Sequence, residues 1–158
     1  MKRGFTMIEL IFVIVIIGTL VAIAIPKLAA TKADAEISAI KATVAVATSA
    51  VPAYFTGQSV AGLTPSMKID LNTWKPKDNT QCKLTYEDSA GGTVDLEIVK
   101  DVNASPSTTC ATPGTMTNDN NLSLIITYTS NATGGPIQKM ITLGIKNTRI
   151  PLNAKSIY

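Results

Sequence analysis

The sequence contains no histidine and only two cysteines among its 158 residues. Histidine is the usual general acid or base near neutral pH and a common metal ligand, so its absence excludes histidine-dependent triads, histidine zinc sites and most proton relays. A chain of this length has room for one domain with a modest core. We therefore expect no enzymatic activity, no metal site and no cofactor.

An apolar run occupies residues 5–25, about 21 residues, which is long enough to span a bilayer as a helix. A single ionised side chain, Glu9, interrupts it. Lys2 and Arg3 precede the run and, by the positive-inside tendency, hold the N-terminus in the cytoplasm. Everything after Pro26 would then face away from the cytoplasm.

An apolar run of this kind occurs in three kinds of segment. A secretory signal peptide is favoured by the basic start and by the cleavage-like tripeptide at residues 22–24. Glu9 counts against it, because a carboxylate inside an apolar stretch costs about 2.5–3.5 kcal/mol on insertion scales. Pro26 is also poorly placed for a signal peptidase. A plain single-pass anchor is the second alternative, and the third depends on the order of the residues.

Residues 2–10 read KRGFTMIEL, and Gly18 and Pro26 follow. This order closely resembles the type III signal sequence of type IV pilins and of type II secretion pseudopilins. The resemblance covers about the first 26 residues without a gap. It includes the basic leader, the glycine before the cut, the aromatic first mature residue and the carboxylate four residues later.

The resemblance implies that a prepilin peptidase removes residues 1–4 by cutting between Gly4 and Phe5, and then N-methylates the new amine of Phe5. Residues 5–26 would remain as a transmembrane and assembly helix. By the same resemblance, Glu9 of an incoming subunit pairs with the Phe5 amine of its neighbour. We expect Glu9 to need that partner, because we expect none within its own apolar helix.

Gly18 and Pro26 are the other two residues to which the resemblance gives a role in assembly, since residues 18–26 would lose helicity in a filament. Glycine is a poor helix former, and Pro26 cannot donate a hydrogen bond to the Ala22 carbonyl. Gly18 could equally be a close-packing site, as small residues often are in membrane helices. The sequence leaves both interpretations open.

Residues 27–55 have the pattern of an amphipathic helix, which we expect to end near Val51 or Phe55 because Pro52 disfavours its continuation. The apolar positions recur at steps of three and four: Ile37, Ile40, Val44, Ala47, Val51 and Tyr54. The opposite face carries Lys32, Asp34, Ser38 and Lys41.

Residues 56–158 are expected to form a globular β-sheet head. Strand patterns occupy residues 82–87, 93–99, 122–129 and 137–145. Residues 88–92 and 130–136 resemble hairpin connections, which predicts an antiparallel meander, and residues 103–121 resemble a long surface loop. The expected fold class is α+β, a long N-terminal helix packed on a small antiparallel sheet, which is also the type IV pilin fold that the resemblance implies.

Cys82 and Cys110 would lie beyond the membrane in an oxidising compartment, so we expect them to form a disulfide. Many type IV pilins place their disulfide closer to the C-terminus, which puts the position of any receptor-binding loop in doubt. Asn103 and Asn121 each follow an acid by two residues and fit the extended bacterial N-glycosylation pattern. Asparagine-rich loops also produce such matches by chance.

Charge is unevenly distributed in the head. Residues 56–119 carry five lysines and eight acids. Residues 120–158 carry no acid and four bases: Lys139, Lys146, Arg149 and Lys155. Opposite charges could attract neighbouring copies, although pairing within the head or simple solvation explains the same pattern. Direct nucleic-acid binding is not expected, because no aromatic residues are interleaved with these bases.

The resemblance implies a structural subunit of a type IV pilus, which polymerises through its N-terminal helix into an extracellular filament for adhesion, motility or DNA uptake. Its partners would be the lipid bilayer before assembly, prepilin peptidase, the inner-membrane assembly platform, other minor pilins and further copies of itself in a helical filament. The alternative is a pseudopilin of a type II secretion or competence system, which forms a short periplasmic filament.

Two features favour the pilus over the pseudopilus. Pseudopilins that resemble the major subunit hold calcium in acidic loops near the C-terminus, whereas no acid follows Asp119 here. The expected disulfide is the other feature. A filament that conducts electrons is disfavoured, because the helix has no aromatic residue between Phe12 and Tyr54, a gap of about 60 Å.

Overall fold

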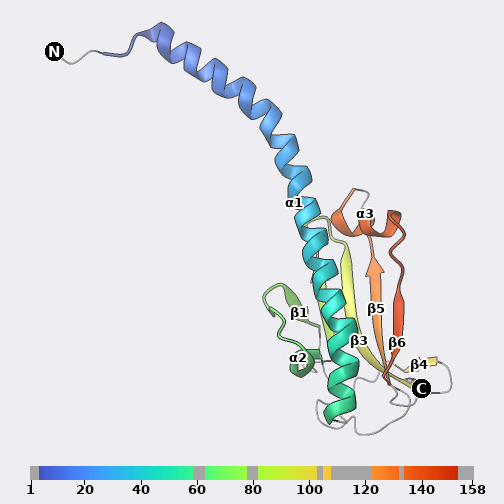
Figure 1. The fold of residues 1–158 in the computed structure, drawn as a ribbon. Helices are drawn as coiled ribbons and strands as arrows, with labels where there is room; N and C mark the ends of the chain where they lie inside the picture. The colour runs from blue at the N-terminus through green and yellow to red at the C-terminus, as the bar shows by residue number, and fades with distance from the viewer. Residues whose placement is uncertain are drawn as a thin grey trace. The chain divides into compact units, whose positions relative to one another are not determined.

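The computed structural model describes residues 4–58, 63–77, 82–102, 105–107, 122–131 and 134–152. It contains the helices α1 (Met7–Gln58), α2 (Leu63–Ser66) and α3 (Pro136–Thr142). The strands are β1 (Trp74–Pro76), β2 (Lys83–Glu87), β3 (Thr93–Val102), β4 (Ser105–Ser107), β5 (Leu122–Thr129) and β6 (Thr148–Pro151) (Figure 1). The chain divides into two compact units, Met1–Ala35 and Glu36–Tyr158, and we call the second the head unit.

Helix α1 is 52 residues long and continues through Pro26 and Pro52. It ends at Gln58, a few residues beyond the predicted end. Phe55, after Pro52, is only 6% exposed, and packing of this kind stabilises a turn that local propensity disfavours. The side-chain hydroxyl of Thr56 donates to the Pro52 carbonyl at 2.9 Å.

The strands form one antiparallel sheet in the order β1-β2-β3-β5-β6, with β4 paired to β3. The predicted strands at residues 82–87, 93–99 and 122–129 correspond to β2, β3 and β5. The predicted turn at residues 88–92 joins β2 to β3, where Asp88 N donates to the Gly92 carbonyl at 2.9 Å. The prediction of an antiparallel meander is therefore confirmed for these three strands.

The predicted strand at residues 137–145 is wrong, because the chain forms helix α3 there. Its β-branched residues favour a strand locally, but the helix signals at both ends prevail. Pro136 occupies a first-turn position, and Gly144, just beyond the helix, has a φ of 90°. The buried Ile137 and Met140 are spaced three residues apart, as on one face of a helix. Residues 130–136 accordingly lead into a helix instead of closing a hairpin.

Three short strands, β1, β4 and β6, were not predicted. β1 and β6 are the two edges of the main strand order, and each ends in a proline, Pro76 and Pro151. Proline cannot donate to a strand ladder, and short edge strands that contain it discourage pairing with another chain. β4 lies within the segment that was predicted to be a loop.

The core of the head unit lies between one face of the sheet and the second half of α1 (Figure 1). From α1 it receives Ile37, Ile40, Ala47, Val51 and Phe55, and from the sheet mainly Leu84, Val94, Leu96, Ile98, Leu122, Leu124 and Ile126. The predicted apolar stripe is therefore largely the buried face, although Val44 and Tyr54 are only partly buried. This arrangement confirms the α+β fold of a long helix packed on a small antiparallel sheet.

A buried carboxylate joins two loops of the head unit. Asp88 is 7% exposed, and its Oδ1 accepts hydrogen bonds from Ala90 N at 2.9 Å and Gly92 N at 2.8 Å. Its Oδ2 accepts from Ile137 N at 3.1 Å, at the start of α3. Asp88 thus fixes the β2–β3 turn and the first turn of α3 together.

Candidate functional site

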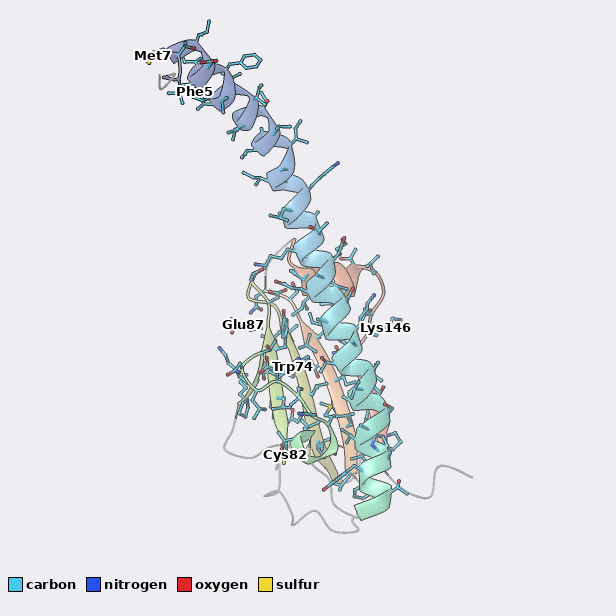
Figure 2. All side chains as sticks on the ribbon, turned by 60° about the vertical axis from the view of Figure 1, so that its left-hand side comes forward. Phe5, Met7, Trp74, Cys82, Glu87 and Lys146 are labelled. Carbon is cyan, nitrogen blue, oxygen red and sulfur yellow. The ribbon has the colours of Figure 1, made fainter. Side chains whose placement is uncertain are left out.

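Residues 7–28 of α1, which we call the apolar segment, have no buried side chain. Its large apolar side chains range in exposure from 41% at Ile16 to 80% at Met7. Figure 2 shows them projecting around the helix. The most apolar window of α1 has a mean hydropathy of 3.0, so its length and composition allow it to span a membrane, a property that signal peptides share.

Glu9 has a partner within its own chain, contrary to the expectation that it would have none. Its Oε2 accepts hydrogen bonds from Thr6 N at 2.9 Å and from Thr6 Oγ1 at 2.7 Å. The Thr6 hydroxyl in turn accepts from Glu9 N at 3.4 Å. This is a capping box, and the Thr-x-x-Glu spacing is its sequence signal. Glu9 therefore helps to start α1, a role that sequence reasoning missed.

The peptide bond between Gly4 and Phe5 precedes α1 and is accessible. Phe5 is 81% exposed, and a side chain built on Gly4 would contact nothing within 4 Å. Gly18 also has open space beside it, and α1 remains helical through Gly18 and Pro26. The side chains assigned to cleavage and assembly are thus all displayed on the surface of the apolar segment or just before it.

Residues 1–25 match a family model that is described as the prokaryotic N-terminal methylation motif. The chain begins with a prepilin signal. This is the signal of type IV pilins and pseudopilins, as the order of residues predicted. No curated protein matches the chain, and no solved structure matches it.

The prepilin signal implies processing by a prepilin peptidase and assembly into a pilus-type filament. Together with the exposed apolar helix, it fits a precursor that is anchored in a membrane. The match concerns the signal as a whole. The separate roles of Gly4, Phe5, Glu9, Gly18 and Pro26 within it remain predictions.

The predicted sites of the head unit are only partly described. Cys82 is 1% exposed and is not a free thiol, but its predicted partner, Cys110, lies outside the described residues. The pairing therefore remains a prediction. Asn103 and Asn121, the two candidate glycosylation residues, also lie outside the described residues.

Part of the acidic charge of the head unit is paired internally. Lys83 Nζ lies 3.2 Å from a carboxylate oxygen of Glu97 and 3.7 Å from one of Asp95. In the basic C-terminal region, Lys139, Lys146 and Arg149 are exposed, and Lys155 lies outside the described residues. Pairing within the head thus accounts for Asp95 and Glu97, and the three described basic residues of the C-terminal region lie at the surface.

Proposed function

We propose that this chain is the structural subunit of a type IV pilus. Before assembly the apolar segment holds it in the inner membrane of a bacterium, with the head unit outside the cytoplasm, and after assembly it forms an extracellular filament. The observation that carries the proposal is an apolar segment without a buried side chain, most of which lies within the matched prepilin signal. Such a surface requires either lipid or other helices of the same kind around it.

In the proposed maturation, prepilin peptidase removes residues 1–4 and methylates the amine of Phe5. The exposure of Phe5 and the open space around Gly4 support this step, because a peptidase needs access to an extended chain. We propose no catalytic role and no cofactor for the chain itself, since it lacks histidine. Its partners would be the peptidase, an inner-membrane assembly platform and other pilins.

In the proposed assembly, Glu9 pairs with the Phe5 amine of a neighbouring subunit. The capping box uses Oε2 of Glu9 for both bonds from Thr6, and among the described residues Oε1 accepts none, so it can receive a further donor. At an effective dielectric near 20, two such charges about 4 Å apart attract by about 4 kcal/mol. This is comparable to the cost of placing the carboxylate alone in an apolar layer.

The decisive experiment separates the charge of Glu9 from its capping role. Glutamine also completes a capping box, so Glu9→Gln keeps the cap and removes the charge, whereas Glu9→Val removes both. Thr6→Val weakens the cap and keeps the charge. We expect few or no filaments from both Glu9 variants, with processed subunit accumulating in the membrane, and nearly normal filaments from Thr6→Val. The measurement is a filament count by electron microscopy at matched subunit levels.

Normal filament numbers from Glu9→Gln would show that Glu9 acts only as a cap. The same images locate the filament. Filaments outside the cell support a pilus, whereas short filaments confined to the envelope assign the chain to a pseudopilus, the alternative that shares the prepilin signal.

Processing has a separate test. Intact-mass analysis of the membrane form should give a chain that begins at N-methylated Phe5. A mature N-terminus at Ile25 would show instead that a signal peptidase removes the apolar segment, which would contradict the proposed function.

A further inference from the structure

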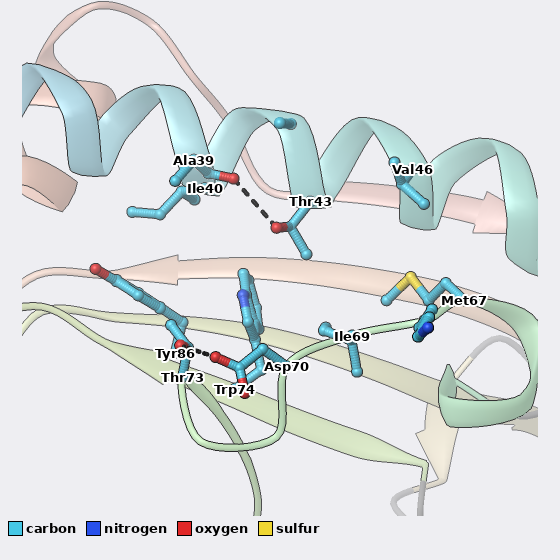
Figure 3. A pocket seen from close by; sticks show the side chains of 12 residues that line it. Ala39, Ile40, Thr43, Val46, Met67, Ile69, Asp70, Thr73, Trp74 and Tyr86 are labelled. Carbon is cyan, nitrogen blue, oxygen red and sulfur yellow. Dashed lines mark hydrogen bonds between the residues drawn. The ribbon is translucent and has the colours of Figure 1, made fainter.

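A groove of about 320 Å³ opens on the head unit between α1 and the segment that leads into β1 (Figure 3). From α1 it is lined mainly by small and apolar side chains, among them Ala39, Ile40, Thr43 and Val46. The opposite wall includes Met67, Ile69, Trp74 and Tyr86. Val46, which lines the groove, is 50% exposed, and Leu71, which follows Asp70 in the segment of the opposite wall, is 48% exposed. An apolar recess with exposed apolar residues around it is typical of a protein-binding site.

Two carboxylates lie in or near this groove. Asp70 lines it and accepts hydrogen bonds from Asn72 N at 3.0 Å and from Thr73 Oγ1 at 2.7 Å. Glu36 lies one helical turn before Ile40 on α1, and its Oε2 is buried without a hydrogen-bond partner among the described residues. Burial raises the pKa of Tyr86, which lines the groove, and the charges of Glu36 and Asp88 raise it further.

An unpaired buried carboxylate oxygen is costly unless a donor reaches it. One cation, Lys68, also lines the groove, but it is exposed. The groove therefore combines apolar walls with acceptor groups, which suits a segment that presents an apolar side chain next to a basic one.

The turn after α3, residues 143–146, has that composition. α3 ends in a Schellman motif, in which Ile145 N donates to the Met140 carbonyl at 3.1 Å and Gly144 N donates to the Ile141 carbonyl at 3.0 Å. These bonds fix the turn and leave Leu143, at 66% exposure, pointing away from the core. Lys146 follows and is exposed.

The groove and this turn lie at opposite edges of the sheet. The groove borders β1 and β2, whereas the turn leads into β6, at the other end of the strand order. Figure 2 shows Trp74 and Lys146 on different sides of α1. A contact between two different patches of identical copies generates a ring if the rotation between copies closes, and an open filament if it does not.

Charge is also complementary between these two regions. No acid follows residue 119 in the sequence, and Lys139, Lys146 and Arg149 are exposed around the turn and β6. A basic surface of this kind attracts an acceptor-bearing groove and repels another copy of itself.

We propose that the groove of one copy receives residues 143–146 of a second copy, with Leu143 between Val46 and Met67 and Lys146 beside Glu36 and Asp70. This contact deepens the proposed function, on which it rests, because a filament would bring copies together in a fixed register. The helices of the apolar segment then need not supply all the contacts between subunits.

Cysteine cross-linking tests the contact in cells that express the full chain. Val46→Cys and Leu143→Cys are combined in one chain, and disulfide-linked dimers and longer ladders are read on non-reducing gels after mild oxidation. Native Cys82 is buried and is not a free thiol, so it does not compete. The matched control replaces Val46→Cys with Ala45→Cys, an exposed neighbour on α1 that does not line the groove. We expect ladders only from the Val46 and Leu143 pair.

A charge exchange adds a second readout. Lys146→Glu in the cross-linking chain should remove most of the dimer band, and adding Asp70→Lys should restore it. Failure of the second change to restore the band would contradict the assignment of Lys146 to these carboxylates.

Electron microscopy of the same cells separates this inference from the proposed function. Filaments without cross-linked dimers would overturn the groove contact and leave the pilin proposal standing. Dimers without filaments would support the contact and contradict the filament. The absence of both would overturn both.

Discussion

The apolar segment and the head unit each contain a carboxylate that accepts a backbone N–H group at the start of a helix. Glu9 does so for α1 in a segment whose side chains are all exposed, and its Oε2 takes both bonds. Asp88 does so for α3 in a closed core, and both of its oxygens are used. The two carboxylates thus differ in their remaining capacity to accept hydrogen bonds. Both oxygens of Asp88 accept bonds within the head unit, whereas Oε1 of Glu9 can still accept one from a neighbouring subunit.

The two parts of α1 differ in the same way. In the apolar segment apolar residues surround the helix, and none is buried. From Glu36 onward the buried residues form one stripe, and the exposed positions outside it include Ser38, Lys41 and Ser49. A helix that is apolar on all sides requires an apolar environment supplied by other molecules. An amphipathic helix instead buries its apolar face against the sheet of its own chain. Changes in the two regions should therefore alter different measurements.

The largest expected effect on the head unit comes from Asp88→Ala, which leaves Gly92 N and Ile137 N buried without an acceptor. At about 1–3 kcal/mol for each orphaned donor, the loss of stability should reach about 2–6 kcal/mol. Trp74 is the only tryptophan and is 3% exposed, so its fluorescence reports unfolding of the head unit in detergent-solubilised full chain. Asp88→Asn keeps one oxygen and should lose less. Equal losses from the two variants would contradict this account.

Paired substitutions of isoleucine test the comparison directly. Ile40 is 1% exposed in the core, and Ile14 is 58% exposed in the apolar segment. Ile40→Ala should destabilise the head unit by about 2–5 kcal/mol, because it removes buried methyl groups and leaves a cavity. Ile14→Ala should leave the unfolding of the head unit unchanged. A comparable loss from Ile14→Ala would show that the two regions are not independent.

Cys82→Ser should lower the melting temperature of the head unit without affecting membrane insertion, because the helix inserts independently of the sheet. If Cys82 is bonded to Cys110, the loss in the chain-entropy model is about 3–4 kcal/mol. Cys110→Ser should then cost the same, and the double variant no more than either single one. Additive losses, or full alkylation of both thiols in the native chain, would refute the pairing.

Much of the fold could be predicted because its signals are local. The long apolar run is visible directly in the sequence. The apolar residues recur with the period of a helix in residues 37–51 and with the period of a strand in β2, β3 and β5. The prepilin signal could be predicted for the same reason, because it is a contiguous series of residues. What it does in the membrane depends on other molecules, which the chain alone does not contain.

The errors have identifiable physical causes. The isoleucines of α3 predict a strand, whereas Pro136 and Gly144, placed as helix start and stop residues, favour the helix that forms. β1 and β6 are too short to show a period, and only pairing with β2 and β5 creates them. Asp88 and the groove both join segments distant in sequence, which no local pattern reveals.

The smallest expected effect concerns Tyr86, which lines the groove of the head unit. Burial, followed by the negative charges of Glu36 and Asp88, raises its pKa above the usual value of about 10. The folded chain therefore keeps the proton longer than the unfolded chain does. Stability that is present below about pH 10 should fall as the pH rises above it, because the unfolded state then binds fewer protons. Tyr86→Phe should lessen this fall, as seen in melting temperatures between about pH 9 and pH 11.

Glu36→Gln isolates the contribution of charge from that of burial. It removes one negative charge and leaves the packing of the tyrosine ring in place, so the alkaline fall should become shallower than in the native chain but steeper than in Tyr86→Phe. Tyr128→Phe is the matched control, because burial alone raises the pKa of Tyr128. Glu36→Gln should therefore reduce the alkaline loss of stability in the Tyr128→Phe chain by at least as much as it does in the native chain. If Glu36→Gln leaves the alkaline fall unchanged, its carboxylate does not act on Tyr86, and the acceptor assigned to the groove is reduced to Asp70 alone.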